Sequence, residues 1–282
     1  MGATPNNMRQ RLLSAAVGLL LVLLILLGFY NISFLFVVSA LSAMAVYELM
    51  DAAKLTRERP LTLLACLAAA AIPFSTHRNI YSHETIALTL YVFLLLLYLL
   101  VRHERVKIKE ICYTMAVSLL VPFAFSTMIF LREKYPEDGL FYLCLILIGS
   151  WVADAGAYFV GTFLGKHKLC PTISPNKTIE GAAGALASNV IGMVLAGLVY
   201  QYLVPGQQGI ELSYLNLALI GLMCAVVSIL GDLTASVIKR QSGIKDYGKI
   251  IPGHGGIMDR CDSLLFVAPF FYLIIRYLPI VL

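Results

Sequence analysis

The stretch that decides the fold is LLSAAVGLLLVLLILLGFYNISFLFVVSALSAMAVY, which covers residues 12–47 without a charged side chain. A membrane-spanning helix needs about 20 consecutive apolar residues, so this run has room for two. The turn-forming sequence GFYN at 28–31 divides the run and predicts a helical hairpin. Arg9 and Arg11 precede the run as in a signal peptide, but no small-x-small cleavage motif follows. We therefore expect an uncleaved first span.

The rest of the chain has a matching composition. Of the 282 residues, 60% are hydrophobic and only 13% are charged, and the mean hydropathy is +0.84. Soluble domains are nearer half apolar and a quarter charged, and disordered chains are poorer still in apolar residues, so both classes are excluded. The six cysteines show no CxxC pair and no zinc-ligand spacing, which argues against a zinc site or a disulfide framework.

Charge-free stretches recur along the whole chain. They are continuous rather than alternating, which is typical of helices and not of a transmembrane barrel. The predicted fold is all-α, a polytopic integral membrane protein with about nine transmembrane helices. No separate soluble domain is expected, and we divide the chain into residues 1–110, with spans one to four, and 111–282, with spans five to nine. The predicted spans are 12–29, 32–53, 60–76, 85–101, 111–131, 140–162, 181–203, 212–238 and 263–282.

The basic residues between these spans predict the orientation. When the N-terminus is grouped with every second loop, that side collects 17 of the 21 lysines and arginines. The other side keeps Arg78, Arg132, Lys134 and Arg276. Because basic loops stay in the cytoplasm, we expect a cytoplasmic N-terminus and, with nine spans, a C-terminus outside. The two longest loops, 163–180 and 239–262, then both face the cytoplasm.

The more polar of these loops follows span eight. Residues 231–262 read GDLTASVIKRQSGIKDYGKIIPGHGGIMDRCD. Asp259 and Asp262, three residues apart, are expected to share a face at the start of span nine. If the helix of span eight continues past residue 231, four side chains share one of its faces: Asp232, Ser236, Lys239 and Arg240.

Carboxylates at membrane depth are costly and normally face a cavity with a partner. Three carboxylates among several basic residues favour a divalent cation together with phosphate, and hard oxygen ligands suit magnesium. The glycines around His254 permit a tight turn close to a ligand. The alternative is that Asp232 simply pairs with Lys239 and Arg240 in a topogenic loop. That alternative leaves the glycine-rich turn, Asp259 and Asp262 unexplained.

A second polar region combines WVADAGAY at 151–158, GKHK at 165–168 and SPNKTIEG at 174–181. Asp154 lies inside an apolar span and needs a partner. The segment 161–166 lacks the P-loop pattern, because His167 follows the lysine. The SPNKT segment is either a turn that offers hydroxyls and an ammonium to a nucleotide or an ordinary loop before a helix. Its candidate binding residues are Asp154, Lys166, Lys168, Ser174, Asn176 and Lys177.

Two further features stay open at this stage. Glu48 and Asp51, at the end of span two, are either interfacial or part of the same cavity. The segment GAAGA at 181–185 is predicted to be a close-packing surface rather than a site.

These motifs together resemble one known family. The segment 236–262 resembles the signature of phosphatidate cytidylyltransferases (CDP-diacylglycerol synthases), with every polar signature position in place. The three upstream segments between 151 and 181 are similar to the bacterial branch. One departure is Cys261, where the family usually has an apolar residue, and we expect this to be tolerated.

The resemblance implies a nucleotidyltransferase of phospholipid biosynthesis. It would transfer CMP from CTP to phosphatidic acid, with one or two magnesium ions, at the cytoplasmic face of the inner membrane. Asp232, Asp259 and Asp262 would hold the metal, and His254 would position substrate. No nucleic-acid partner is expected, and whether the chain forms a homodimer is left open. The residues implied to contact or neutralise the phosphates are Ser236, Lys239, Arg240, Lys245 and Arg260.

Two other functions compete with this one. A cation-coupled transporter would use Asp154 and Asp232 as ion ligands, but carriers usually have related halves, and the 232–262 pattern has no second copy. A CTP-dependent polyprenol kinase would transfer only the γ-phosphate.

Overall fold

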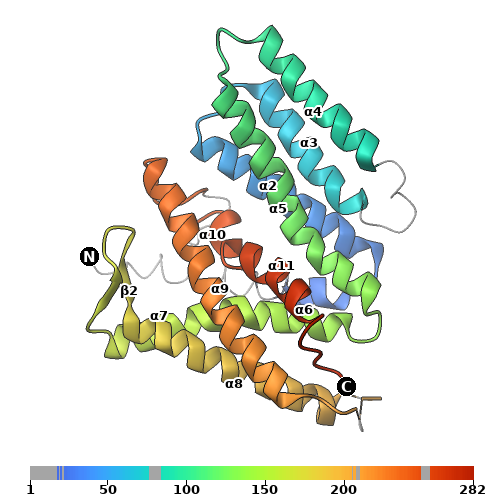
Figure 1. Ribbon diagram of the computed structural model, residues 1–282, viewed down its shortest axis with the longest axis vertical. Helices are drawn as coiled ribbons and strands as arrows, with labels where there is room; N and C mark the ends of the chain where they lie inside the picture. Colours follow the sequence, from blue (N-terminus) through green and yellow to red (C-terminus); the bar gives the residue numbers. More distant parts are fainter. Residues whose placement is uncertain are drawn as a thin grey trace. The chain divides into compact units, whose positions relative to one another are not determined.

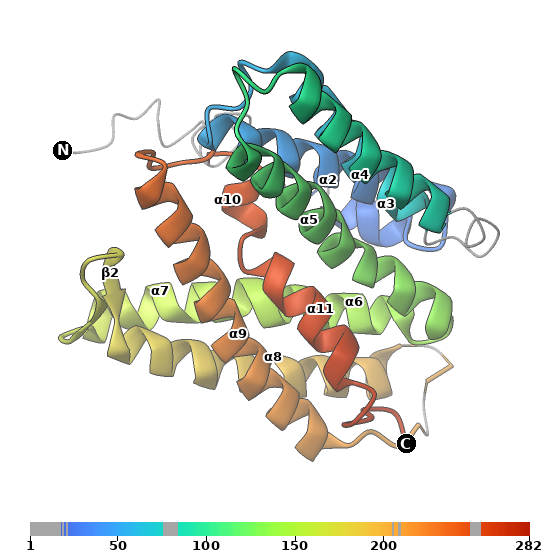
Figure 2. The ribbon, with the colours of Figure 1, turned by 45° about the horizontal axis from the view of Figure 1, so that its top comes forward.

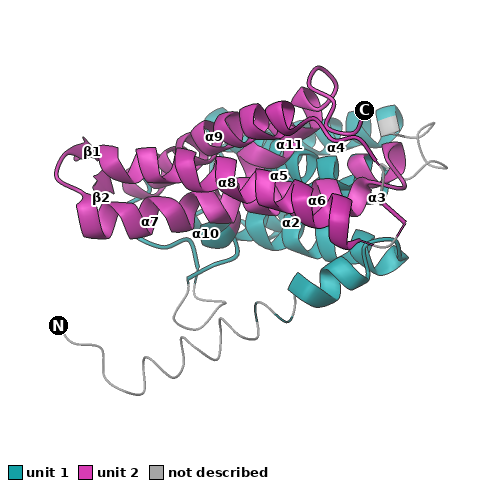
Figure 3. Ribbon diagram, turned by 90° about the horizontal axis from the view of Figure 1, so that it is seen from below, with its two compact units in different colours: residues 1–130, 242–260 teal, residues 131–241, 261–282 magenta. Residues whose placement is uncertain are grey.

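The computed structural model describes residues 18, 20, 22–75, 84–204, 206–207, 210–248 and 255–282. The chain divides into two compact units (Figure 3). Unit 1 comprises Met1–Phe130 and Ser242–Arg260, and unit 2 comprises Leu131–Gln241 and Cys261–Leu282. The predicted division after residue 110 therefore falls inside unit 1. Residues 12–17, 19 and 21 of the first predicted span and His254 lie outside the described residues.

Unit 1 is helical. Residues 22–27 are helical and a turn follows at 28–30, where the sequence predicted the hairpin to turn. Helices α2 and α3 pack against each other, and α4 follows beside α3 (Figure 1). The elements are α2 (Ile32–Ala52), α3 (Arg59–Ser75), α4 (Glu84–Val101) and α5 (Ile108–Lys134), of which the part up to Phe130 belongs to this unit.

Unit 2 is built around a helix with a π-helical segment in its middle. The helix runs as α6 (Gly139–Leu147), the π-helical η2 (Ile148–Val152) and α7 (Ala153–Leu164). Helix α8 lies along α7 and also packs on α9, which in turn contacts α11 (Figures 1 and 2). The other elements are β1 (Lys168–Cys170), β2 (Ser174–Thr178), α8 (Ile179–Leu203), α9 (Tyr214–Gln241) and α11 (Leu264–Ile274). The short α10 (Met258–Cys261) has its first three residues in unit 1 and its last in unit 2.

Small residues let α7 and α8 approach each other closely. A Cβ atom added at Gly184 would lie 2.5 Å from Cβ of Val160, and one added at Gly181 would lie 2.8 Å from the carbonyl oxygen of Ala157. Helices in membranes associate through such small-residue contacts. The predicted close-packing role of the GAAGA segment is confirmed.

The described residues contain five helices that are long and apolar enough to cross a membrane, and two shorter apolar ones. All seven coincide with predicted spans, and the protein is a multi-pass membrane protein. The long helices are Ile32–Ala52, Ile108–Lys134, Gly139–Leu164, Ile179–Leu203 and Tyr214–Gln241, and the short ones are Arg59–Ser75 and Thr85–Val101.

Two predictions about local structure are wrong. The ninth span was expected over 263–282, but α11 ends at Ile274 and is only about 16 Å long by the helical rise of 1.5 Å per residue. The tail instead pairs with the segment before α9, where the Ser213 amide donates to the Ile280 carbonyl over 2.9 Å. Pro279 favours this extended backbone, because the residue before a proline avoids helical angles.

The second correction concerns 163–180. This segment is not an irregular loop, since β1 and β2 form an antiparallel hairpin in which Lys168 pairs with Thr178 and Cys170 with Ser174. Helix α8 begins directly after the hairpin, and the Thr178 hydroxyl caps it by accepting from the Gly181 amide over 3.0 Å. Side-chain caps of this kind stabilise helix starts. The hairpin is thus anchored to the helix that follows it.

Candidate active site

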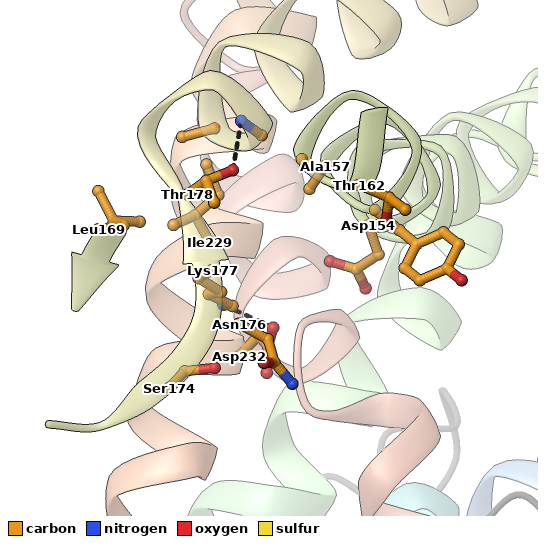
Figure 4. Close-up of a pocket in the computed structure, with 14 residues that line it drawn as sticks. Asp154, Ala157, Thr162, Leu169, Ser174, Asn176, Lys177, Thr178, Ile229 and Asp232 are labelled. Atoms are coloured by element: carbon orange, nitrogen blue, oxygen red, sulfur yellow. Dashed lines mark hydrogen bonds and ion pairs between the residues drawn. The ribbon is translucent and has the colours of Figure 1, made fainter. Parts of the chain in front are cut away.

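A cavity of about 480 Å³ lies inside unit 2, between the hairpin and helices α7, α8 and α9 (Figure 4). Its walls combine two carboxylates, one ammonium group and several hydroxyl and amide groups with apolar side chains. Five of the polar lining residues were predicted from the sequence: Asp154, Ser174, Asn176, Lys177 and Asp232.

Asp154 stands in the first turn of α7, just after the π-helical segment. Each of its carboxylate oxygens accepts a hydroxyl hydrogen bond. Ser228 donates to Oδ1 over 3.2 Å and Ser263 donates to Oδ2 over 2.9 Å, while the Ser263 hydroxyl also lies 2.7 Å from that of Ser150. These two hydrogen bonds fix the orientation of the carboxylate. The partners that Asp154 needs inside an apolar span are therefore two serines from other segments of unit 2.

Asp232 forms an ion pair with Lys177 of the hairpin. The Lys177 ammonium nitrogen lies 2.5 Å from Oδ2 of Asp232, and both side chains are more than two-thirds buried. The sequence had offered Lys239 and Arg240 as partners of Asp232, and the ion pair with Lys177 was not predicted. The pair thus joins hairpin and helix α9 at the cavity.

The predicted continuation of span eight as a helix is confirmed, because α9 runs through Asp232 to Gln241. Ser236 and Lys239 are half-buried, and Arg240 is exposed. The Nε of Arg240 donates to the carbonyl oxygen of Ile173, in the turn of the hairpin, over 3.4 Å. The end of α9 therefore also contacts the hairpin.

Asp262 interacts electrostatically with Asp232 and Asp154 and is only 7% exposed. Its Oδ1 accepts the Ser263 amide over 2.9 Å. Burial, followed by the negative charge of Asp232, raises the pKa of Asp262 to about 7, while Lys239 acts in the opposite direction. Asp154 adds a smaller repulsion. Three acidic side chains thus act on one another in unit 2.

The predicted shared face of Asp259 and Asp262 is wrong. Helix α10 ends at Cys261 and α11 begins at Leu264, so the two aspartates do not lie on one continuous helix. Asp259 instead orders its own segment, since its Oδ2 accepts the amides of Tyr247 (2.8 Å) and Gly256 (3.0 Å). Residues 242–260, called here the signature segment, belong to unit 1. Lys245 and Arg260 of this segment are exposed.

The base of the hairpin is fixed by Glu180. Its carboxylate accepts the backbone amides of Lys166 and His167 and lies 2.6 Å from Nδ1 of His167. Lys166 and Lys168 are exposed and are not among the residues that line the cavity. Of the predicted basic residues in this region, only Lys177 reaches the cavity wall.

The described residues contain no group of three or more His, Cys, Asp or Glu side chains already arranged around a cation position. The donor chemistry nevertheless fits a divalent ion, because Asp154, Asp232 and Asp262 repel one another and hard oxygen donors suit magnesium. The predicted set of Asp232, Asp259 and Asp262 draws on both units and stays a prediction.

Sequence reasoning missed several residues of the site. The serines that bind Asp154 carry no charge and sit in apolar runs, so no pattern set them apart. Tyr158 and Thr162 line the cavity one and two turns after Asp154, and that spacing would have placed them on its face. Asp51 is exposed and its Oδ1 accepts the Thr56 hydroxyl, whereas Glu48 is buried.

Comparison with known proteins identifies the class. A model of the cytidylyltransferase family matches residues 9–278, and the chain belongs to this family. It is 34% identical over 276 residues to the phosphatidate cytidylyltransferase of Bacillus subtilis, a match that covers 95% of this chain and 98% of the relative. The protein of the same name from Staphylococcus haemolyticus is 32% identical, with coverage of 93% and 96%. That from Haemophilus influenzae is 40% identical over about half of each chain.

Proposed function

We propose that this chain transfers CMP from CTP to phosphatidic acid, forming CDP-diacylglycerol and pyrophosphate. Membership of the cytidylyltransferase family, with relatives named phosphatidate cytidylyltransferase along nearly the whole chain, supports this activity. The structural observation that carries the proposal is the cavity in which the Lys177 ammonium and the carboxylates of Asp154 and Asp232 meet. Such a site combines an ammonium group that can bind phosphate with carboxylates that can bind a cation.

The reaction is an in-line displacement at the α-phosphorus of CTP. An oxygen of the phosphatidate phosphate forms the new P–O bond, and the bond to the β-phosphate oxygen breaks as pyrophosphate leaves. The attacking phosphate is already largely ionised at pH 7, so no strong general base is required. Catalysis then consists mainly of positioning and of charge neutralisation.

The chain's cationic groups have the neutralising role in this proposal. Lys177, whose ammonium lies in the cavity, would bind a phosphate oxygen of the nucleotide. Ser174 and Asn176 on the same strand offer a hydroxyl and an amide to the nucleotide. The remaining phosphate charge would be met by Lys239, Arg240, Lys245 and Arg260, and His254 would position substrate.

Magnesium is proposed as the cofactor, held by Asp232 and Asp262 with Asp259 as a further ligand. Bound there, it would neutralise the triphosphate and favour departure of pyrophosphate. Asp154 belongs to the same acidic group, and its serine partners would orient its carboxylate.

The proposed setting is the cytoplasmic membrane, with a cytoplasmic N-terminus and the site on the cytoplasmic face. The sorting of 17 of the 21 basic residues to one side supports this orientation. It also agrees with the substrates, because CTP is a cytosolic solute and phosphatidic acid is a lipid of the leaflet.

Labelled CTP tests this function against its rivals. Membranes containing the chain are incubated with phosphatidic acid or a polyprenol and with CTP labelled at the α- or at the γ-phosphate. We expect lipid label only from α-labelled CTP, only with phosphatidic acid, and none after a chelator removes magnesium. Label from γ-labelled CTP in polyprenol would show a kinase, and no label from either would favour a transporter.

A further inference from the structure

Glu48 of α2 makes contacts that the proposed reaction does not explain. Glu48 is a charged residue in a mostly apolar helix, and its side chain is only 2% exposed. Its two oxygens accept two consecutive backbone amides of the signature segment. Ile257 donates to Oε1 over 3.0 Å and Met258 donates to Oε2 over 2.7 Å, across more than two hundred residues of sequence. A buried carboxylate is retained only where such partners compensate its desolvation.

The backbone around this carboxylate is shaped to admit it. A Cβ atom added at Gly256 would overlap both carboxylate oxygens of Glu48, and one added at Gly248 would overlap Oε1. Neither glycine has a positive φ angle, so the requirement for glycine here is close approach and not backbone conformation. Both described arms of the signature segment, 242–248 and 255–260, therefore abut Glu48.

A second carboxylate ties the same two arms together. Asp259 accepts the amide of Tyr247 in the first arm and that of Gly256 in the second. Asp259 follows Met258 directly, and Met258 is one of the two residues bound by Glu48. The position of the Asp259 carboxylate is consequently coupled through one peptide unit to Glu48.

From this geometry we infer that Glu48 is a positioning residue of the transferase: it holds the signature segment so that Asp259 is correctly placed for the reacting phosphates or their cation. The inference rests on the proposed function. Glu48 itself touches neither substrate nor metal and acts through the amides of Ile257 and Met258. Residues that orient the groups of a metal or phosphate site typically change activity by about 10- to 100-fold when they are substituted.

The first test is Glu48→Gln, compared with Asp51→Asn on the same helix. Glutamine keeps the size of the side chain but places a donor against one of the two amide donors. We expect kcat for CDP-diacylglycerol formation, per folded molecule, to fall at least about tenfold, with an unchanged KM for phosphatidic acid. Amide hydrogen exchange at 257–258 should become faster. Asp51→Asn should change neither quantity.

Three results would overturn the inference. One is faster exchange at 257–258 with an unchanged kcat, because the segment would then not need to be held. Another is a lower kcat with unchanged exchange, because Glu48 would then act by another route. The third is a lower yield of folded protein with a normal kcat per folded molecule, because Glu48 would then have only a structural role.

A double-mutant cycle keeps the test decisive if Glu48→Gln does not fold. Gly256→Ala should lower kcat because its methyl group collides with Glu48, and Glu48→Asp shortens the colliding side chain. We expect Gly256→Ala to lower kcat much less in the Glu48→Asp background than alone; equal losses would contradict the contact. If the wild-type chain makes no CDP-diacylglycerol, the proposed function fails by itself, and exchange at 257–258 still decides whether Glu48 holds the segment.

Discussion

The ammonium nitrogen of Lys177 lies 2.5 Å from Oδ2 of Asp232, and this ion pair joins a β-hairpin to a membrane helix at the wall of the cavity. The two residues are 55 positions apart, and each has oppositely charged residues nearer in sequence. A partly buried pair of this kind gains from its low-dielectric surroundings. The two residues can also bind different partners: the lysine ammonium can bind a phosphate, and the aspartate carboxylate can bind a cation.

Replacing Lys177 by methionine should lower the rate of CMP transfer on the order of 100-fold or more, because one preorganised cationic group is lost from the site. Lys177→Arg keeps the positive charge but replaces the compact ammonium group. Its rate of CMP transfer should lie between those of the wild type and Lys177→Met. Initial rates with labelled CTP measure the effect. The control is Lys107→Met, which removes an exposed charge in unit 1. Equal activity of both methionine variants would contradict the assignment of Lys177.

Ser263→Ala should reduce activity about tenfold and lower the melting temperature. The change removes a hydrogen bond to the Asp154 carboxylate, and hydrogen bonds to charged groups contribute about 1.5–3 kcal/mol. The matched control is Ser39→Ala, because the buried Ser39 hydroxyl has no hydrogen-bond partner among the described residues. That variant should be as stable as the wild type or slightly more so. Thermal unfolding in detergent and the transfer assay compare them.

Gly184→Ala should destabilise the contact between α7 and α8, because its methyl group would lie 2.5 Å from Cβ of Val160. Overpacking of this kind typically costs about 1–3 kcal/mol. Adding Val160→Ala should restore much of the lost stability. Gly18→Ala is the control, since nothing lies within 4 Å of its added Cβ. A normal melting temperature for Gly184→Ala would show that the helices are not packed as closely as described.

Asp262→Asn should abolish activity and yet stabilise the metal-free protein at neutral pH. Burial and the charge of Asp232 raise the pKa of Asp262 to about 7, so ionisation of this group opposes folding as the pH rises from about 4 towards 7. Asparagine removes that penalty. With a chelator present, the gain in melting temperature should be largest above pH 7 and absent near pH 4. A uniform loss at both pH values would instead indicate a purely structural hydrogen bond.

The sequence was sufficient to predict helices α2 to α9 and the acidic residues Asp154, Asp232 and Asp262. An uncharged stretch long enough to cross the membrane predicts a spanning helix from local composition alone. The structure has a helix at each such predicted position from α2 to α9. Asp154 and Asp232 stood out because a carboxylate inside an apolar run is rare. These predictions needed only local composition.

What failed depended on contacts between distant segments. The pairing of β1 with β2 was hidden, because the polar segment 174–178 resembles a loop until its backbone hydrogen bonds are known. Lys239 and Arg240 appeared to be the natural partners of Asp232, and the ion pair with Lys177 of the hairpin was not predicted. For the same reason the role of Glu48 was left open, since its partners are backbone amides and have no side-chain signature.

The π-helical turn Ile148–Val152 sets the direction in which Asp154 points. A π-turn is equivalent to one extra residue inserted into an α-helix, and each α-helical residue rotates the chain by about 100° around the helix axis. A uniform α-helix through the same residues would turn the Asp154 carboxylate away from Ser228 and Ser263. One additional residue in the turn thus separates a helix that only crosses the membrane from one that presents an acid to the cavity.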